Sequence, residues 1–257
     1  MAETIGVFDS GIGGLTVASA IKHRFPNVPV VYFGDTAHLP YGDKSAQNIK
    51  KYTEAIASFL FEQNCNRFVV ACNSASSILD MVKKMPAFDS VVNVIDPMVE
   101  YVANQKLKRV GVIGTKRTIY SGVYGKLIAL KSPKTEVYQI ATPLLAPMIE
   151  EGFITGSVTR HVIDQYLGQF PDMDALILGC THYPLIKTEI DHYFRGKVKL
   201  LDAPELVANS LAAQLDIRAD SHKEDHFFVS DYTSSFEQTA RLFFGEKVKL
   251  EKIDIFG

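Results

Sequence analysis

Cysteine is scarce in this chain, whose 257 residues include only three, Cys65, Cys72 and Cys180. A small and odd number of cysteines argues against a disulfide framework and favours free thiols. The sequence also contains neither a Cys-x-x-Cys nor a His-Glu-x-x-His pattern. We therefore expect no metal site.

Long apolar runs and a strong net charge are absent as well. No stretch of about 18 apolar residues and no basic-then-apolar leader pattern occurs, so we expect no contact with membranes and a cytoplasmic location. The net charge of −2 gives little attraction to nucleic acids. Hydrophobic residues make up 47% of the chain, which is enough for one large α/β domain or two small ones.

Short apolar stretches that are typical of buried strands alternate along the chain with segments that are typical of helices. Strands are expected at 4–8, 28–33, 68–71, 91–95, 110–113, 137–140, 175–178, 198–201, 226–230 and 248–252. The longer helices are expected at 45–64, 157–169, 204–215 and 235–244. This alternation predicts an α/β fold with mainly parallel sheets that are covered by helices on both faces.

Two local patterns occur twice, at nearly equal separations along the chain. Gly6-Val-Phe-Asp-Ser10 resembles Gly111-Val-Ile-Gly-Thr115, and Cys72 and Cys180 each follow an apolar strand. Any two α/β units look alike at this level, but the repeat favours two similar α/β domains related by a pseudo-twofold axis, with the active site in the cleft between them. We expect residues 1–95 and 211–257 to form the first domain and residues 96–210 the second.

Polar or reactive residues follow several of the expected strands. They are Asp9-Ser10, Pro40-Tyr41-Gly42, Cys72-Asn73-Ser74, Thr115 to Thr118, and Cys180-Thr181-His182. In open α/β sheets, ligands bind beyond the carboxyl ends of the strands. Helix amino termini at that edge favour anions and lower thiol pKa values from about 8.5. The pattern therefore predicts a cleft for a small anionic ligand, with two thiols of lowered pKa.

Each of these residues also has a purely structural interpretation. A cysteine at a strand end is more often a small buried apolar residue than a catalyst, and we give Cys65 that interpretation. Asp9 could be only a helix cap, and His182 could simply bond to the backbone. His38 is interpreted as incidental. The Gly-rich turn after Asp9 is not a dinucleotide fingerprint, because Thr16 stands at the third glycine position.

Two cysteines that face one cleft suit proton transfer at a carbon atom. One thiolate removes a proton from one side of a carbon next to a carboxylate, and a thiol delivers a proton from the other side. The carbon is inverted without a covalent intermediate or an organic cofactor. Asp9 would then exchange protons with Cys72, and His182 with Cys180. N–H and hydroxyl donors would stabilise the carbanion-like transition state.

Four motifs resemble, in order and spacing, those of the bacterial glutamate racemases: Asp9-Ser-Gly-Ile-Gly-Gly-Leu-Thr-Val17, Pro40-Tyr-Gly42, Ala71-Cys-Asn-Ser74 and Leu178-Gly-Cys-Thr-His-Tyr-Pro184. The resemblance covers nearly the whole chain. It implies a cofactor-independent racemase that makes D-glutamate from L-glutamate for peptidoglycan synthesis, built from two α/β domains and usually found as a homodimer. It also implies that Cys72 and Cys180 are the proton acceptor and donor, with Asp9 and His182 as assisting acid/base residues.

The same resemblance implies the contacts of the substrate. These are Asp9, Ser10, Tyr41, Gly42, Asn73, Ser74, Thr115, Thr118, Thr181 and His182, with Glu150 orienting His182 from behind. The chain departs from the usual family pattern at two positions. Ser74 replaces a threonine, which keeps the hydroxyl and loses a methyl group, and Asp96 replaces a glutamate.

Three other functions fit parts of the pattern. An aspartate or broad-specificity racemase of the same superfamily would use the same two cysteines. A cysteine hydrolase would use Cys180 as nucleophile and His182 as base, but it would leave Cys72 without a function. A module that binds a small anion without catalysis would need neither thiol.

Overall fold

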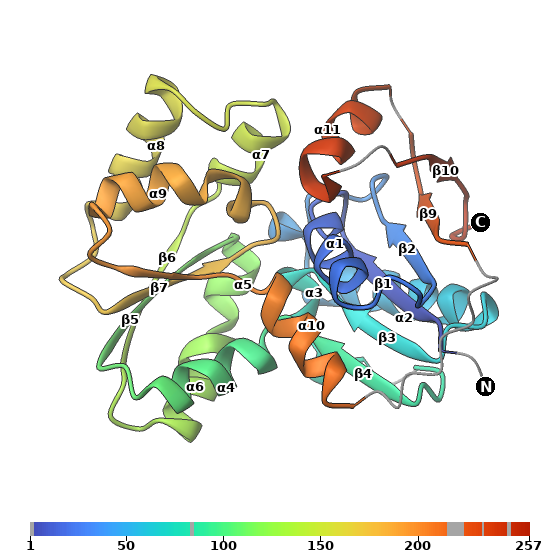
Figure 1. Cartoon of the computed structure of the whole chain (residues 1–257), viewed down its shortest axis with the longest axis horizontal. Helices are drawn as coiled ribbons and strands as arrows, with labels where there is room; N and C mark the ends of the chain where they lie inside the picture. The colour runs from blue at the N-terminus through green and yellow to red at the C-terminus, as the bar shows by residue number, and fades with distance from the viewer. Residues whose placement is uncertain (1–2, 83–84, 215–223, 233, 246–247) are drawn as a thin grey trace.

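The protein is described here by a computed structural model, which covers residues 3–82, 85–214, 224–232, 234–245 and 248–257. Within these ranges all strand pairings are parallel, and they form two sheets in separate parts of the molecule (Figure 1). The strand order is β10-β9-β2-β1-β3-β4 in one sheet and β6-β5-β7-β8 in the other. We call the part built on the larger sheet the first half and the other part the second half. The predicted α/β fold is confirmed.

The strands are short. In the first half they are β1 (Ile5–Asp9), β2 (Val30–Gly34), β3 (Arg67–Val70), β4 (Ser90–Asn93), β9 (His226–Val229) and β10 (Leu250–Lys252). In the second half they are β5 (Arg109–Gly114), β6 (Glu136–Ala141), β7 (Ala175–Gly179) and β8 (Lys199–Leu201).

Helices follow most of the strands. The helices are α1 (Leu15–Arg24), α2 (Ala46–Glu62), α3 (Asn73–Ser76), α4 (Asp96–Gln105), α5 (Lys116–Ser121), α6 (Val123–Lys131), α7 (Leu145–Glu150), α8 (Ser157–Leu167), α9 (Lys187–Phe194), α10 (Pro204–Ala212) and α11 (Ser234–Phe244). Three 3₁₀ turns span Tyr41–Asp43, Leu79–Met81 and Tyr183–Ile186. In the described ranges, no helix is both long enough and apolar enough to cross a membrane.

The two sheets repeat one strand order. The order β2-β1-β3-β4 in the first half corresponds to β6-β5-β7-β8 in the second, which supports the predicted internal repeat. Strands β9 and β10 come last in the chain, yet they join the first sheet beside β2. The domain limits remain a proposal, since the limit between residues 210 and 211 falls inside α10. Residues 215–223 of the first domain, and the expected end of the 204–215 helix, lie outside the described residues.

Both faces of the first sheet are buried. In β2, Val30 and Tyr32 belong to the core shared with α1, whereas Val31 and Phe33 belong to the core shared with α2. Burial on both faces explains why such strands are apolar throughout rather than alternating. The core on the α1 side continues into the second half, and α1 and α10 lie side by side between the halves (Figure 1). The carboxyl ends of β1, β3 and β7 therefore meet in one region.

Candidate functional site

A cavity of about 260 Å³ lies at the carboxyl ends of strands from both halves, and both cysteines line it. Its volume is slightly below the range of about 300–1,000 Å³ that is typical for drug-sized ligands, so it suits a small metabolite. Cys72 follows β3 and Cys180 follows β7, which is the corresponding strand of the second sheet. The lining residues are Ser10, Gly11, Leu39, Pro40, Tyr41, Gly42, Cys72, Asn73, Ser74, Thr115, Ala146, Pro147, Glu150, Cys180, Thr181 and His182.

The thiol of the first half lies among acidic and hydroxyl groups. Cys72 is followed at once by α3, and its Sγ atom lies 3.4 Å from the Ser10 hydroxyl oxygen. Asp9 ends β1 and is fully buried. Its Oδ2 atom accepts hydrogen bonds from the backbone N–H groups of Gly14 at 2.8 Å and Gly11 at 3.4 Å. These bonds hold the turn that leads into α1, so the structural interpretation of Asp9 describes at least part of its role.

The thiol of the second half lies next to an imidazole. The Sγ atom of Cys180 is 3.6 Å from Nδ1 of His182, and Nε2 of the same ring is 2.8 Å from Oε1 of Glu150. The sequence left open whether a histidine two residues after the cysteine would face it. The 3₁₀ turn that begins at Tyr183 directs the ring back toward the sulfur. Cys180, His182 and Glu150 thus form a chain of polar contacts from the cavity to the end of α7.

The protonation of the two sides differs. Burial raises the pKa of the Cys72 thiol to about 12, and the Asp9 carboxylate adds to this effect. Burial also raises the pKa of Asp9 itself. For His182, burial opposes the charged form, but the Cys180 sulfur and Glu150 outweigh it and hold the pKa well above its ordinary value. At neutral pH Cys72 is therefore a neutral thiol and His182 is a cation.

The expectation that helix ends lower the pKa of both thiols is wrong for Cys72. The helix after this cysteine, α3, contains four residues and ends at Ser76. So short a helix has a weak dipole, because the dipole grows from the alignment of successive peptide units. Hydrogen bonds from Ser10 and the Ala75 backbone favour the thiolate, but burial outweighs them.

Hydrogen bonds join the two halves beside the cavity. The hydroxyl oxygens of Ser74 and Thr115 are 2.8 Å apart, and those of Thr115 and Thr118 are 3.1 Å apart. The Tyr124 hydroxyl donates to Oδ1 of Asn73 at 2.8 Å, which leaves the side-chain N–H groups of Asn73 as its donors for a ligand. These bonds hold the wall of the first half against α5 and α6 of the second.

The Gly-rich turn lies directly against the catalytic candidates of the second half. A Cβ atom at Gly13 would come within 2.6 Å of both the His182 ring and Oγ1 of Thr181, so a larger residue does not fit there. The ring of Phe243 packs edge-on against His182 from α11, with 5.2 Å between ring centroids. His182 is thus enclosed by segments of the first half on two sides.

Most of the residues predicted for the site meet at this cavity, but two lie behind it. Asp9 is buried below the Gly-rich turn, and Thr118 is fully buried behind Thr115. Neither lines the cavity, so their contact with a substrate stays a prediction. Leu39, Ala146, Pro147 and Phe243 are not predicted from the sequence. No local pattern marks them, because loops and helices of distant segments bring them to the site.

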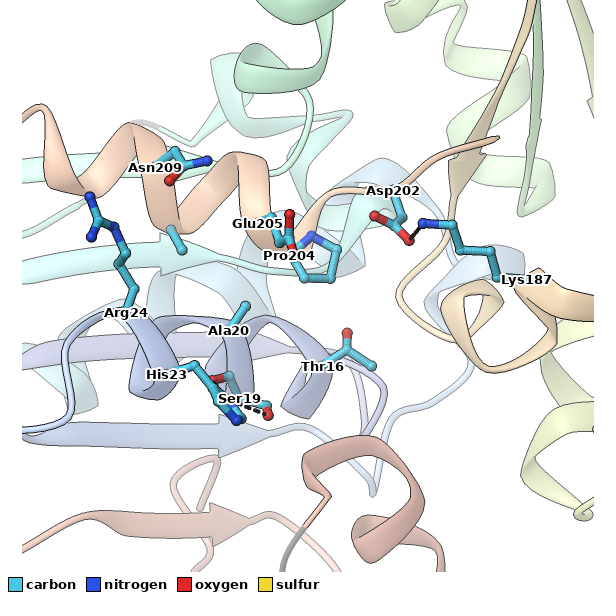
Figure 2. A pocket seen from close by; sticks show the side chains of 11 residues that line it. Thr16, Ser19, Ala20, His23, Arg24, Lys187, Asp202, Pro204, Glu205 and Asn209 are labelled. Carbon is cyan, nitrogen blue, oxygen red and sulfur yellow. Dashed lines mark hydrogen bonds and ion pairs between the residues drawn. The ribbon is translucent and has the colours of Figure 1, made fainter. Parts of the chain in front are cut away.

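A second and larger cavity, of about 590 Å³, lies between α1 and α10 (Figure 2). Figure 2 shows Arg24 of α1 extending toward Asn209 of α10, with the Lys187–Asp202 ion pair of 2.8 Å at one end of the cavity. Neither cysteine lines this cavity. Volume alone therefore does not identify the functional site, and the chemistry of the lining side chains does.

The described lining of the smaller cavity lacks the lysine that a Schiff-base cofactor needs. Pyridoxal phosphate requires a lysine for its Schiff base, and the described lining residues include none. In the part of the chain that the structure describes, no cluster of three or more His, Cys, Asp or Glu side chains could hold a metal ion.

The sequence and the structure were compared with known proteins. Residues 15–211 match the model of the family described as Asp/Glu/Hydantoin racemase. The chain is 43% identical to the glutamate racemase of Aquifex aeolicus (strain VF5) over 248 residues, which cover 95% of each chain. It is 41% identical to the glutamate racemase of Aquifex pyrophilus, over 94% of each chain.

Among solved structures, the glutamate racemase from Francisella tularensis subsp. tularensis SCHU S4 in complex with D-glutamate is similar with a TM-score of 0.93 and 38% identity. The match covers 99% of this chain and 98% of that one. The Picrophilus torridus aspartate racemase is similar with a TM-score of 0.62 and 16% identity, over 95% of this chain and 100% of that one, a likeness that concerns the fold alone.

Proposed function

Since the chain belongs to the Asp/Glu/Hydantoin racemase family, we propose that it interconverts L-glutamate and D-glutamate by proton transfer between two cysteines, without a cofactor. The observation that supports this proposal most strongly is that Cys72 and Cys180 line one small cavity and come from corresponding strands of the two halves. Hydroxyl and amide groups on the same walls can hold the carboxylates of the substrate.

Each turnover moves two protons. In one direction the Cys180 thiolate takes the Cα proton of the substrate, and the Cys72 thiol gives its proton to the opposite side of the same carbon. The C–H bond that breaks and the C–H bond that forms belong to one carbon, so the configuration inverts. The enzyme is left with a Cys180 thiol and a Cys72 thiolate. In the other direction the two cysteines exchange roles.

Return to the starting state requires a proton to leave Cys180 and another to reach Cys72. His182 is placed to relay the first, with its Nδ1 atom 3.6 Å from the sulfur. The Cys180 thiolate is a main cause of the raised His182 pKa, so once Cys180 is a thiol the imidazolium can lose a proton to water and then accept that of the thiol. Cys72 with a pKa of about 12 is a strong base once ionised and quickly regains a proton. The Asp9 carboxyl has a pKa raised by burial, which suits it to exchange that proton.

The similarities favour glutamate over the alternative substrates. The relatives described as glutamate racemases are 43% and 41% identical over nearly the whole chain, whereas the aspartate racemase is 16% identical. The contact between Cys180 and His182 would also suit a hydrolase, but that function leaves Cys72 in the same cavity without a role. A racemase uses both thiols.

The proposal includes a biological setting. D-Glutamate is a component of peptidoglycan, so the enzyme would act in the cytoplasm and supply D-glutamate for cell-wall synthesis. A homodimer is expected from the resemblance to the racemases and is part of the same proposal.

The test is isotope exchange. Purified protein incubated with L-glutamate in D₂O, without added pyridoxal phosphate, should form D-glutamate and place deuterium at Cα, as measured by NMR and circular dichroism. L-Aspartate in a parallel reaction should turn over far more slowly. Equal turnover of aspartate would favour the broad-specificity racemase. Activity that disappears on dialysis and returns with pyridoxal phosphate would exclude the two-cysteine mechanism.

A further inference from the structure

Asp35 is a buried acid beside the site that the mechanism does not use. It follows directly after β2, and it is fully buried. From there the chain runs through residues 36–38 to the cavity, where Leu39, Pro40, Tyr41 and Gly42 form part of the wall. A buried carboxylate destabilises a protein unless hydrogen bonds compensate it, so its partners indicate what it does.

Three side chains donate hydrogen bonds to Asp35. The Tyr41 hydroxyl lies 2.6 Å from Oδ2, the Ser230 hydroxyl lies 2.7 Å from Oδ1, and Nδ1 of His38 lies 2.8 Å from Oδ1. Two of these donors belong to the segment that leads to the cavity, and Ser230 directly follows β9. Asp35 therefore joins the cavity wall to a strand that comes from the far end of the chain.

We propose that Asp35 is a positioning residue for the substrate wall: through the Tyr41 hydroxyl it fixes residues 39–42 in the place where they contact glutamate. This inference depends on the function proposed above. The Tyr41 ring lines the cavity, but its hydroxyl points to Asp35 and not to the ligand space. Burial and the Asp35 carboxylate keep the pKa of Tyr41 well above its ordinary value, so the phenol keeps the proton that it donates.

The wall that Tyr41 holds also touches the second half. A Cβ atom at Gly42 would come within 2.8 Å of Cβ of Thr115, so the backbone at Gly42 fits closely against that residue. A small displacement of the wall would change both the ligand space and the contact with Thr115. For this reason the Tyr41–Asp35 bond is expected to affect binding of the substrate more than the proton transfers at the sulfurs.

His38 completes the support. Its sequence context indicates an incidental residue, but in the structure its ring bonds to Asp35. Its ring stacks on Tyr52 with 4.1 Å between centroids and meets the edge of Phe256 at 4.6 Å. These rings pack around His38, and Asp35 itself is fully buried. Water is thereby kept from the hydrogen bonds of Asp35, and in a low-dielectric environment such bonds are stronger.

The experiment measures KM and kcat for both enantiomers in Asp35→Asn, Tyr41→Phe and the double variant, together with the Kd of D-glutamate by calorimetry. Each single variant should raise KM and Kd about tenfold and change kcat by less than about threefold. The effect of the double variant should fall well short of the product of the two single effects, because Tyr41→Phe removes a hydrogen bond that Asp35→Asn already weakens. Asp174→Asn is the matched control. Asp174 accepts backbone N–H bonds from Lys108 and Arg109 in the second half, away from the cavity.

The Asp174→Asn control should lower the melting temperature without changing KM. If Asp35 had only a structural role, Asp35→Asn would behave in the same way. An unchanged KM and Kd in Tyr41→Phe, or effects that multiply in the double variant, would overturn the inference. Should Asp35→Asn fail to fold, Tyr41→Phe and Ser230→Ala still decide the question, since each removes one donor. Failure of the wild type to racemise glutamate would instead refute the proposed function.

Discussion

The two halves end corresponding strands with a cysteine, but they surround the two sulfurs with opposite charge. Cys72 lies next to the Ser10 hydroxyl and close to the buried Asp9 carboxyl, and burial, with the Asp9 carboxylate as the second cause, raises the pKa of the thiol. Cys180 lies next to His182, which Glu150 helps to keep protonated. A repeat of strand order therefore does not imply a repeat of chemistry. Each half brings its own kind of proton carrier to one shared carbon.

This asymmetry is compatible with a reversible racemase. L- and D-glutamate have equal free energies in water, so kcat/KM must be the same in both directions. Differences between the two sides can appear only in kcat and KM separately, in isotope effects and in the reactivity of each thiol. These quantities therefore test the comparison between the Cys72 and Cys180 sides.

Removal of either thiol should abolish most of the activity. Cys72→Ser and Cys180→Ser should each lower kcat by about a thousandfold or more, because a hydroxyl is a far weaker base than a thiolate. Racemisation followed by circular dichroism measures the effect. Cys65→Ala is the matched control, since it removes a buried cysteine outside the cavity, and it should keep wild-type kcat. Wild-type activity in one of the two serine variants would mean that a single base suffices.

The thiols should also differ in alkylation. With a pKa of about 12, only about one part in ten thousand of Cys72 is thiolate at pH 8. Its rate of labelling by iodoacetamide, measured by mass spectrometry, should rise tenfold per pH unit up to at least pH 10. Cys180, beside a cation, should be labelled faster at pH 8. A plateau for Cys72 below pH 9 would contradict the charge difference between the sides.

The assisting residues should affect opposite enantiomers. Asp9→Asn and His182→Gln should each lower kcat about a hundredfold, because each slows the proton transfers of one cysteine. With α-deuterated substrates, the kinetic isotope effect should increase for one enantiomer in the first variant and for the other enantiomer in the second. An increase for the same enantiomer in both variants would show that Asp9 and His182 act on one side.

Loss of the Glu150 carboxylate should act through His182. The folded-state pKa of His182 is raised, so the stability that protonation provides is fully present below about pH 6.5 and is lost as the pH rises through the folded pKa. In Glu150→Gln this stability should be lost at lower pH. The alkaline decrease of kcat should also begin at lower pH, so that kcat at pH 8 is about tenfold lower than in the wild type. Melting temperatures and rates between pH 6 and 10 measure both. If the alkaline sides of both pH profiles stay where they are in the wild type, Glu150 does not take part in the proton pathway.

The smallest effect is expected at Ser74. Its hydroxyl contacts Thr115 across the halves, and Ser74→Thr keeps that hydroxyl and adds the methyl group that is usual in the family. KM for glutamate should change by less than about threefold, since such consensus substitutions are mild. Ser74→Ala, which removes the bond between the halves, should raise KM more. Equal KM values in the two variants would show that the Ser74–Thr115 contact does not matter for binding.

Features that depend on neighbouring residues were readable from the sequence. The helix expected at 45–64 is present as α2, and the Ser45 hydroxyl accepts a hydrogen bond from the Asn48 backbone N–H at 3.2 Å as its cap. The strand before each cysteine is also present, as β3 and β7. The elements after the cysteines are short, namely the four-residue α3 and the 3₁₀ turn Tyr183–Ile186. His182 takes the capping position of the second without a side-chain bond.

Features that depend on distant segments were not readable. The sequence indicates no role for Asp35, whose partner Ser230 lies 195 residues further along the chain. It also indicates a lowered pKa for Cys72, because burial by the assembled halves cannot be seen in the motif Ala71-Cys-Asn-Ser74. Only Thr118 and Asp9 among the predicted contacts lie behind the cavity, and their depth is set by the packing of other residues.

The sequence by itself determined the alternating α/β pattern, the two cysteine contexts and the residues that gather at the strand ends, because these follow from side-chain periodicity and from residues adjacent in the chain. The tertiary structure decided which thiol stays protonated, which acid supports which wall, and that one cavity holds both sulfurs. Burial and charge act through space, and the distances that govern them exist only after segments far apart in the chain have packed together.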